Sequence, residues 1–316
     1  MACMLWGSIA ISLEQVFGAL LGDTHVSKGV RMVVVELRLV SAVVAMFSGM
    51  ALGVCGLVMQ TIFGNPLADP SLLGVNTGAS IGVAIAIVIL GGSFAVGTMP
   101  LLGQVLLVVL AIIGSLAVLS LILLLSRWLR DSSRVLIVGL MVGFGGASVV
   151  GMLQYLSSSD GLQRFYVWGM GQFDSVGYAN LPFYLLSLGV GILALLTQVK
   201  WLNALLMGEA YAENLGLRVR RTRTFLLAFV GSLTAIITAY CGPVAFLGLA
   251  APHLARLLLR TANHHFLLPG AMLVGSALAL ICHALSHLPI YGQLLPINVL
   301  TPLVGVPIVL YLVLKA

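Results

Sequence analysis

The sequence predicts an all-α membrane protein, a polytopic bundle of about ten transmembrane helices. Of its 316 residues, 60% are hydrophobic and only 8% are charged, whereas ordinary globular domains carry roughly 25% charged residues. The mean hydropathy is +1.15. No Asp, Glu, Lys or Arg occurs from Ser71 to Ser126, a run that can cross a bilayer twice at roughly 20 residues a pass. This composition excludes a soluble enzyme.

The spans follow one another along the chain, separated by short polar or Gly/Pro-rich turns. The opening stretch Met1–Leu13 supplies about half a span, so we expect the first helix to be short or truncated. We treat 1–316 as a single transmembrane domain. Nine further spans are expected near 39–62, 72–90, 101–126, 135–157, 181–199, 224–241, 243–259, 268–287 and 295–314.

Two interruptions between spans are informative. Asn65–Pro70 places two prolines and one acid at a span boundary, where proline ends a helix. Ser157–Asn180 is the longest polar stretch on the side of the membrane that we assign to the outside. Its aromatic and charged residues predict a short helix at the membrane interface. Its aromatic residues could equally be simple interfacial anchors.

Basic residues give the orientation, because cytoplasmic loops carry an excess of Lys and Arg. The span count puts most of the 15 basic residues on one side. We assign that side, and the C-terminus, to the cytoplasm. The net charge of +6 therefore reflects topology rather than nucleic-acid binding. The cytoplasmic group comprises Arg127, Arg130, Arg134, Lys200, Arg218, Arg220, Arg221, Arg223, Arg256, Arg260 and Lys315.

The same count predicts two inverted halves. Four spans, 39–157, begin at the outer side, and four others, 224–314, begin at the cytoplasmic side. Such inverted-repeat layouts are common in transporters.

Small residues are abundant, with 36 glycines in the chain. They let membrane helices approach closely, which is the simplest explanation for any one of them. The span near 135–157 also suits a path-lining role, because small and polar side chains share it. The candidate path residues are Gly143, Gly146, Ser148 and Gln154.

The sequence lacks the motifs for nucleotide hydrolysis and for ion coupling. No GxxxxGK[ST] phosphate loop occurs, and the only lysines are Lys28, Lys200 and Lys315. All nine carboxylates lie at or near the expected span ends, so the buried acids typical of ion coupling are not expected. The chain is predicted to be a transport subunit that is no enzyme itself and takes its energy from another protein.

Metal and cofactor sites are likewise not expected. The four cysteines share no metal-ligand spacing. His283 and His287 lie four residues apart on one helical face, a spacing that could hold haem iron or another metal. Packing or hydrogen bonding between helices is the commoner role for such a pair. His264 and His265 are expected to face the cytoplasm in a short loop.

Three motifs carry a resemblance to a known family. Gly64–Val75, Gly242–Arg256, and Leu295–Thr301 followed by Gly305–Pro307 resemble signatures of the permeases of bacterial iron-siderophore, haem and vitamin B12 ABC importers, the type II importers. The resemblance spans nearly the whole chain. The matching motif residues are Asn65, Pro66, Asp69, Pro70, Pro252, His253 and Arg256.

The resemblance implies a ten-helix permease of the bacterial inner membrane, which takes up an iron chelate or cobalamin. It implies a homodimer with the path at its two-fold axis, two cytoplasmic ATP-binding subunits and a periplasmic substrate-binding protein. The loop 200–223 would be the cytoplasmic coupling loop. Its ATPase-coupling residues would be Gly208, Glu209, Ala210, Asn214, Leu215, Gly216 and Leu217.

The chain departs from the family at its outer side. Members usually carry an Arg-Leu-Pro-Arg motif before the second helix, and here Arg38-Leu39-Val40-Ser41 keeps only the first arginine. An arginine of the B12 permease aligns with His287. Docking of the binding protein would therefore rest on Arg38, Arg164 and His287 in a weaker form.

Two other classes remain as alternatives. A stand-alone channel or secondary transporter would work without partner subunits and would need intramembrane ionisable groups. A membrane-embedded enzyme would need convergent acids, histidines or a metal cluster, and the spans offer only the pair His283 and His287.

Overall fold

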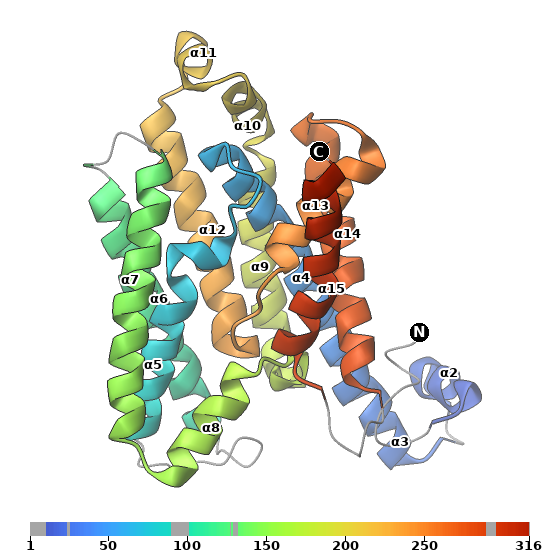
Figure 1. The fold of residues 1–316 in the computed structure, drawn as a ribbon. Coiled ribbons are helices and arrows are strands. Elements are labelled where there is room, and N and C mark those ends of the chain that lie inside the picture. The colour runs from blue at the N-terminus through green and yellow to red at the C-terminus, as the bar shows by residue number, and fades with distance from the viewer. Residues whose placement is uncertain are drawn as a thin grey trace.

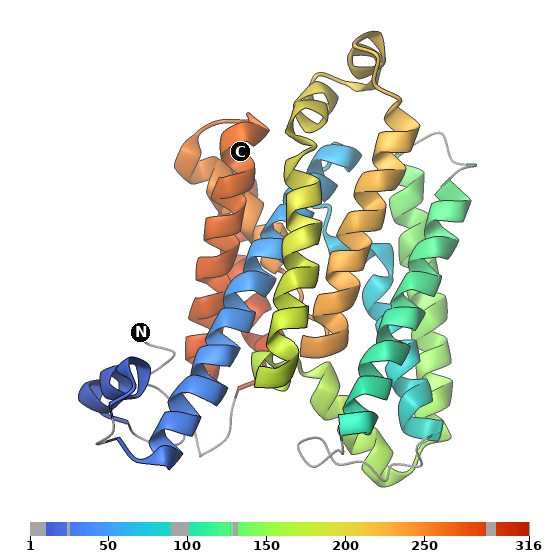
Figure 2. The same ribbon diagram turned by 180° about the vertical axis from the view of Figure 1, so that it is seen from behind.

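Helices run the length of the molecule in the computed structural model, which describes residues 11–23, 26–89, 101–126, 128, 132–288 and 295–315. All regular secondary structure in these residues is helical (Figures 1 and 2). The elements are α2 (Leu13–Leu21), α3 (Lys28–Met32), η1 (Val33–Arg38), α4 (Leu39–Phe63), η2 (Pro70–Leu73), α5 (Val75–Ile89), α6 (Leu101–Ser126), α7 (Ser132–Tyr155), α8 (Ser159–Gly169), η3 (Phe173–Ser175), η4 (Tyr178–Asn180), α9 (Leu181–Leu196), α10 (Val199–Leu206), α11 (Glu209–Asn214), α12 (Val219–Cys241), α13 (Leu247–Leu259), α14 (His264–Ser286) and α15 (Ile297–Lys315).

The predicted spans 39–314 all correspond to helices. Within the described residues, 6 helical segments are long and apolar enough to cross a membrane, the first running without a break from Lys28 to Phe63. Three shorter apolar helices, α5, α13 and α15, complete the predicted set. The half-span expected at Met1–Leu13 falls largely on residues 1–10, outside the described residues, and α2 follows it.

Helix α4 is the centre of the bundle and is buried along most of its length. Its glycines let neighbouring backbones approach closely. A Cβ on Gly49 would lie 2.2 Å from the carbonyl oxygen of Gly275 in α14, and one on Gly56 would lie 1.6 Å from that of Gly248 in α13. No side chain fits at these contacts, so helix packing here depends on glycine.

Two of the short helices occupy corresponding places in the two halves. Helix α5 is the second span of the first set and follows the irregular segment Asn65–Asp69 and η2. Helix α13 is the second span of the other set and follows the irregular segment 242–246, which contains Pro243. Proline and glycine shorten both helices, and such paired interruptions are typical of inverted-repeat transporters.

Chain direction confirms the inverted halves. In Figure 1, α4 begins at the lower end of the molecule, whereas α12 begins at the upper end. The upper end carries α10 and α11, and the lower end carries α2, α3 and α8. The charge argument predicts that the upper end, here the cytoplasmic end, faces the cytoplasm and that the lower end, here the outer end, faces away from it.

Helix α8 confirms the short helix predicted within Ser157–Asn180. Ser158 caps it by accepting a hydrogen bond from the backbone N–H of Gly161. The helix lies across the outer end of the bundle (Figure 1).

Candidate functional site

Helices α10 and α11 project from the cytoplasmic end (Figure 1). Gly208 and Gly216 flank α11 with φ angles of 103° and 87°, a backbone conformation that favours glycine. A small core holds the projection together. It is formed by Ala204, Ala212, Leu217 and Val219, each buried.

An ion pair ties this projection to the bundle. The guanidinium of Arg223 in α12 donates to the carboxylate of Glu209, the first residue of α11. Because the Arg223 side chain is only 14% exposed, the pair is partly shielded from solvent and fixes the start of α11. Glu209 therefore positions α11 on α12.

The predicted coupling residues gather at the tip of the projection, with one exception. Gly208, Glu209, Ala210, Asn214, Leu215 and Gly216 are exposed, whereas Leu217 is buried in the small core. Sequence reasoning missed three exposed apolar side chains beside them, Leu206, Met207 and Tyr211. Exposed apolar side chains clustered at one tip are a signal for a protein partner.

A buried polar cluster joins α10 to α4 and α14. His264 is 1% exposed, and its Nε2 lies 2.7 Å from Oγ1 of Thr61. Its backbone N–H and its Nδ1 contact Oδ1 of Asn203 at 2.8 and 3.0 Å. The expectation that His264 faces the cytoplasm is wrong, because His264 begins α14 under α10; His265 is exposed as expected.

The first two signature motifs meet inside the bundle. A Cβ on Gly248 would lie 2.9 Å from Cδ of Pro70 and 3.1 Å from Oδ2 of Asp69. Asp69 caps η2 by accepting a hydrogen bond from the N–H of Ser71 at 2.8 Å. Asp69 lies between spans as expected, but it is only 8% exposed, so the expectation that the chain has no buried acid is wrong for this residue.

Gln60 links the end of α4 to α13. Its Oε1 accepts a hydrogen bond from Arg256, and its Nε2 lies 3.3 Å from Nδ1 of His253. Asn65 lies just beyond α4 and accepts a hydrogen bond from the N–H of Leu67. Pro66 is exposed, whereas Pro252 is buried inside α13. Of the motif residues, Asp69, Pro70 and Pro252 are thus buried in the bundle, whereas Pro66 is exposed.

The four candidate path residues lie on different faces of α7. Gly143 and Gly146 face α5, where a Cβ on Gly146 would lie 2.4 Å from Cγ2 of Thr77. Ser148 lies on the exposed face, with its hydroxyl bonded to the carbonyl of Phe144 in its own helix. Of these three residues, only Ser148 lies on the exposed face of α7.

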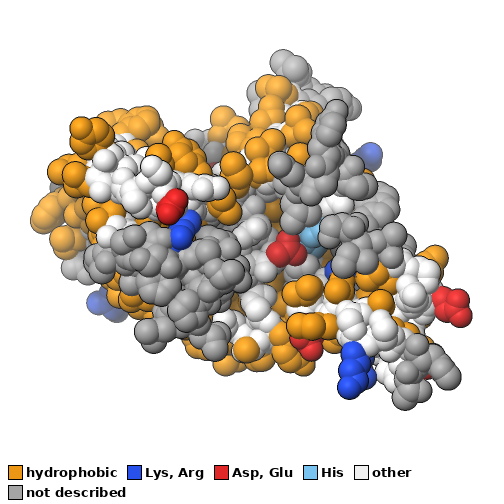
Figure 3. Space-filling view, turned by 90° about the horizontal axis from the view of Figure 1, so that it is seen from below, with side chains coloured by type: hydrophobic (Ala, Val, Ile, Leu, Met, Phe, Trp, Pro, Cys, Tyr) orange, Lys and Arg blue, Asp and Glu red, His pale blue; other side chains and the backbone are white. Residues whose placement is uncertain are grey.

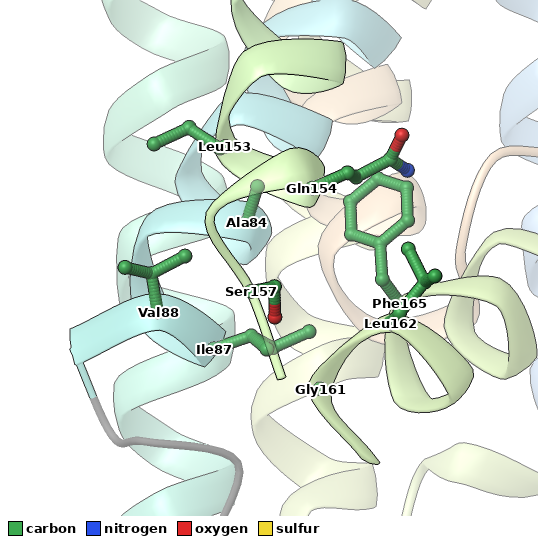
Figure 4. Close-up of a pocket in the computed structure, with 9 residues that line it drawn as sticks. All are labelled: Ala84, Ile87, Val88, Leu153, Gln154, Ser157, Gly161, Leu162 and Phe165. Carbon is green, nitrogen blue, oxygen red and sulfur yellow. The ribbon is translucent and has the colours of Figure 1, made fainter. Parts of the chain in front are cut away.

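Gln154 lies beside a small, mostly apolar pocket near the outer end of α7. Figure 4 shows its side chain close to Phe165 of α8, with Ala84 of α5 on the other side. The pocket separates α7 from α8. A role of Gln154 in a path stays a prediction.

The three predicted docking residues lie toward the outer end. Arg38 is buried at the end of η1, and Arg164 is half-buried in α8. His287 caps the C-terminus of α14, where its Nε2 lies 3.6 Å from Oδ2 of Asp174. Seen from this end, an acidic side chain adjoins histidine atoms near the middle of the surface (Figure 3).

Asp174 and His287 shift each other's titration. The interaction with the Asp174 carboxylate raises the pKa of His287 above its ordinary value. Burial alone would raise the pKa of Asp174, but the interaction with His287 holds it below its usual range. The two groups therefore stabilise each other's charged forms.

His283 joins this pair in a compact cluster. One ligand atom each from Asp174, His283 and His287 lies within 4.8 Å of the others. The two imidazole rings meet edge to face, with centroids 4.5 Å apart. The helical spacing predicted the histidine pair, but nothing in the sequence placed Asp174 beside it.

Known proteins match the chain over almost its full length. Residues 1–315 match the FecCD transport family. The chain is 37% identical over 282 residues to the hemin transport system permease protein HmuU of Yersinia pestis, covering 89% of this chain and 82% of that protein. It is 33% identical over 312 residues to the vitamin B12 import system permease protein BtuC of Serratia proteamaculans, covering 96% and 90%.

Solved structures agree with the fold. An ABC transporter assigned to the metal-chelate type, in an inward-facing conformation, superposes with a TM-score of 0.83 at 27% identity, covering 96% of this chain and 100% of that one. PsaBC from Streptococcus pneumoniae shares the fold, with a TM-score of 0.60 at 14% identity over 95% of this chain and 94% of that one. The chain is a multi-pass permease of the bacterial inner membrane and belongs to the FecCD transport family.

Proposed function

We propose that this chain is the permease subunit of an ATP-binding-cassette importer that takes up an iron chelate, either a siderophore complex or haem, or cobalamin. The relationship to permeases named for hemin and vitamin B12 carries this proposal. Those names describe two large cargoes that each hold a metal in a macrocycle. The walls of this bundle are rich in small side chains, which suits passage of a bulky solute without tight binding.

The energy would come from separate ATPase subunits docked on α10 and α11. The sequence has no phosphate loop of its own. The glycine-framed tip exposes Leu206, Met207, Tyr211 and Leu215 to the cytoplasm. These side chains would fill a groove on the ATPase, and the small core behind them would transmit movement to α12.

The importer would be a homodimer fed by a periplasmic binding protein. Helix α7 exposes a broad apolar face that includes Met141, Phe144 and Met152. Part of this face would meet lipid, and the part around Ser148 would line a path between the two copies. At the outer end, Arg38, Arg164 and His287 would contribute to docking of the binding protein.

The test is transport by the reconstituted complex in proteoliposomes. Glu209→Arg would break the ion pair with Arg223, and Gly216→Pro would force φ from +87° to about −65°. We expect both variants to lose ATP-driven uptake at least about tenfold while remaining folded. Glu14→Arg reverses an exposed charge on α2 and serves as the matched control, with uptake unchanged. Normal uptake by either coupling variant would show that α11 is not the coupling element.

A stand-alone channel or secondary transporter is the alternative, and one observation favours it. Asp69 is buried, and its Oδ2 has no hydrogen-bond partner among the described residues. Buried acids of this kind serve ion coupling in secondary transporters. Uptake by the chain alone that stops when an ionophore collapses the proton gradient would support this alternative. ATP-dependent uptake that survives the ionophore would exclude it.

A further inference from the structure

We propose that Asp174, His283 and His287 form a binding site for a divalent transition-metal ion at the outer end of the permease. The two histidines come from the end of α14, and Asp174 comes from η3 in the connection between α8 and α9. Their ligand atoms lie within 4.8 Å of one another. This inference goes beyond the proposed transport function and does not depend on it.

His287 is oriented as a metal ligand. Its Nδ1 lies 3.0 Å from the carbonyl oxygen of His283 and 3.1 Å from Oγ of Ser286. The Ser286 hydroxyl itself donates to that carbonyl at 2.8 Å. Nδ1–H therefore donates to these oxygens, and Nε2 is the atom that faces Asp174 and would bind a metal ion once its proton is displaced. Metal-binding histidines usually donate their second ring N–H to a carbonyl or carboxylate in this way.

His283 holds a ring nitrogen that no described group satisfies. Its Nε2 lies 3.1 Å from Oγ of Ser41, and this hydroxyl donates to the carbonyl of Arg38 at 3.2 Å. Nε2 must therefore carry the proton, which it donates to Ser41. His283 is 1% exposed, and its Nδ1 has no hydrogen-bond partner among the described residues. An unsatisfied buried nitrogen costs about 1–3 kcal/mol, and a cation would remove that cost.

The donor set selects the class of ion. Two imidazoles and one carboxylate suit Zn²⁺, Fe²⁺ or Co²⁺, whereas Mg²⁺ and Ca²⁺ prefer oxygen ligands. Ligand atoms in a tetrahedral zinc site lie about 3.3 Å apart, given bonds of about 2.0–2.1 Å. The 3.6 Å between His287 Nε2 and Asp174 Oδ2 is already close to that spacing.

The surroundings allow a partly open site. Asp174 also lines a cavity of about 450 Å³ between α6, α8, α9 and α12, which leaves room for a water or an external ligand on the ion. The positive charge of Arg38 acts on His287 and opposes a cation. We therefore expect an affinity weaker than that of a closed structural zinc site.

The test is Co²⁺ and Zn²⁺ titration of the purified full-length chain, carrying a tag without histidine. We expect one ion per chain and a Co²⁺ absorption spectrum with imidazole ligands. Asp174→Asn and His287→Asn each remove a direct ligand and should weaken binding by at least about 10–100-fold, the loss typical of removing an outer-shell partner. The matched control is His265→Asn, an exposed histidine at the other end of the molecule, which should bind like the original chain.

Two results would overturn the site. Wild-type chain that binds no ion would leave Asp174 and His287 as an ion pair alone. Equal affinity in the original chain and in both cluster variants would place the metal elsewhere. Asp174 and His287 are only partly buried, so these variants are expected to fold, and the thermal unfolding of each is compared directly. Neither result depends on whether the chain transports anything.

Discussion

Asn203 supplies the acceptor for the buried end of α14. Its Oδ1 contacts both the backbone N–H and Nδ1 of His264. Asn203→Ala removes this acceptor and should lower the free energy of unfolding by about 1–3 kcal/mol, because buried donors lose their partner. Asn214→Ala, exposed at the tip of α11, should leave it unchanged. Denaturant titration in mixed micelles measures both, and equal stability of the two variants would contradict this role.

The pair of Glu209 and Arg223 can be tested by exchanging its charges. If Glu209 acts by positioning α11, the double variant Glu209→Arg with Arg223→Glu should recover most of the uptake that Glu209→Arg loses, since the ion pair is restored. The measurement is ATP-driven uptake by the reconstituted complex. A double variant as inactive as the single one would mean that the Glu209 carboxylate itself contacts the ATPase.

Single residues were predicted unevenly, and distance along the chain explains why. The tip residues Glu209 and Gly216 were predicted through the family resemblance, which rests on a contiguous stretch of the sequence. Asp69 and Asp174 lie in irregular segments whose surroundings come from helices far away in sequence. Their burial and partners depend on how α13 and α14 pack, which local patterns do not encode.

Glycine contacts set the spacing between elements. Gly56 in α4 lies against the backbone of Gly248 in α13, whereas a Cβ added to Gly189 in α9 would meet nothing within 4 Å. Gly56→Ala should lower the free energy of unfolding by about 1–3 kcal/mol or more, because the backbones must separate. Gly189→Ala should keep or slightly raise it through better helix propensity. Equal free energies of unfolding for the two variants would contradict the close approach of α4 and α13.

The helices themselves could largely be predicted from hydropathy. The predicted span 101–126 coincides with α6, and 39–62 nearly coincides with α4. The second signature was less predictable: the span expected at 243–259 starts as an irregular segment, and α13 begins only at Leu247. Hydropathy cannot distinguish an apolar helix from an apolar irregular segment. Here Gly242 and Pro243 interrupt the helical conformation between α12 and α13.

At the scale of the whole molecule, sidedness rests on the distribution of basic residues. Cys55, Cys241 and Cys282 are buried, so a single added cysteine in a Cys3→Ser background can be labelled selectively. In spheroplasts, Glu213→Cys at the tip of α11 should react with a membrane-impermeant maleimide only after the membrane is permeabilised. Asp160→Cys in α8 should react in intact spheroplasts. The reverse pattern would invert the topology.

The central claim is that the chain transports with energy supplied by a separate ATPase. It is tested most directly by purifying the tagged chain from its native membranes in mild detergent and identifying the co-purifying proteins by mass spectrometry. We predict a phosphate-loop ATPase in equal amount, held through α10 and α11. Recovery of the chain alone, still moving solute in liposomes without ATP, would contradict the claim and support a channel or secondary transporter.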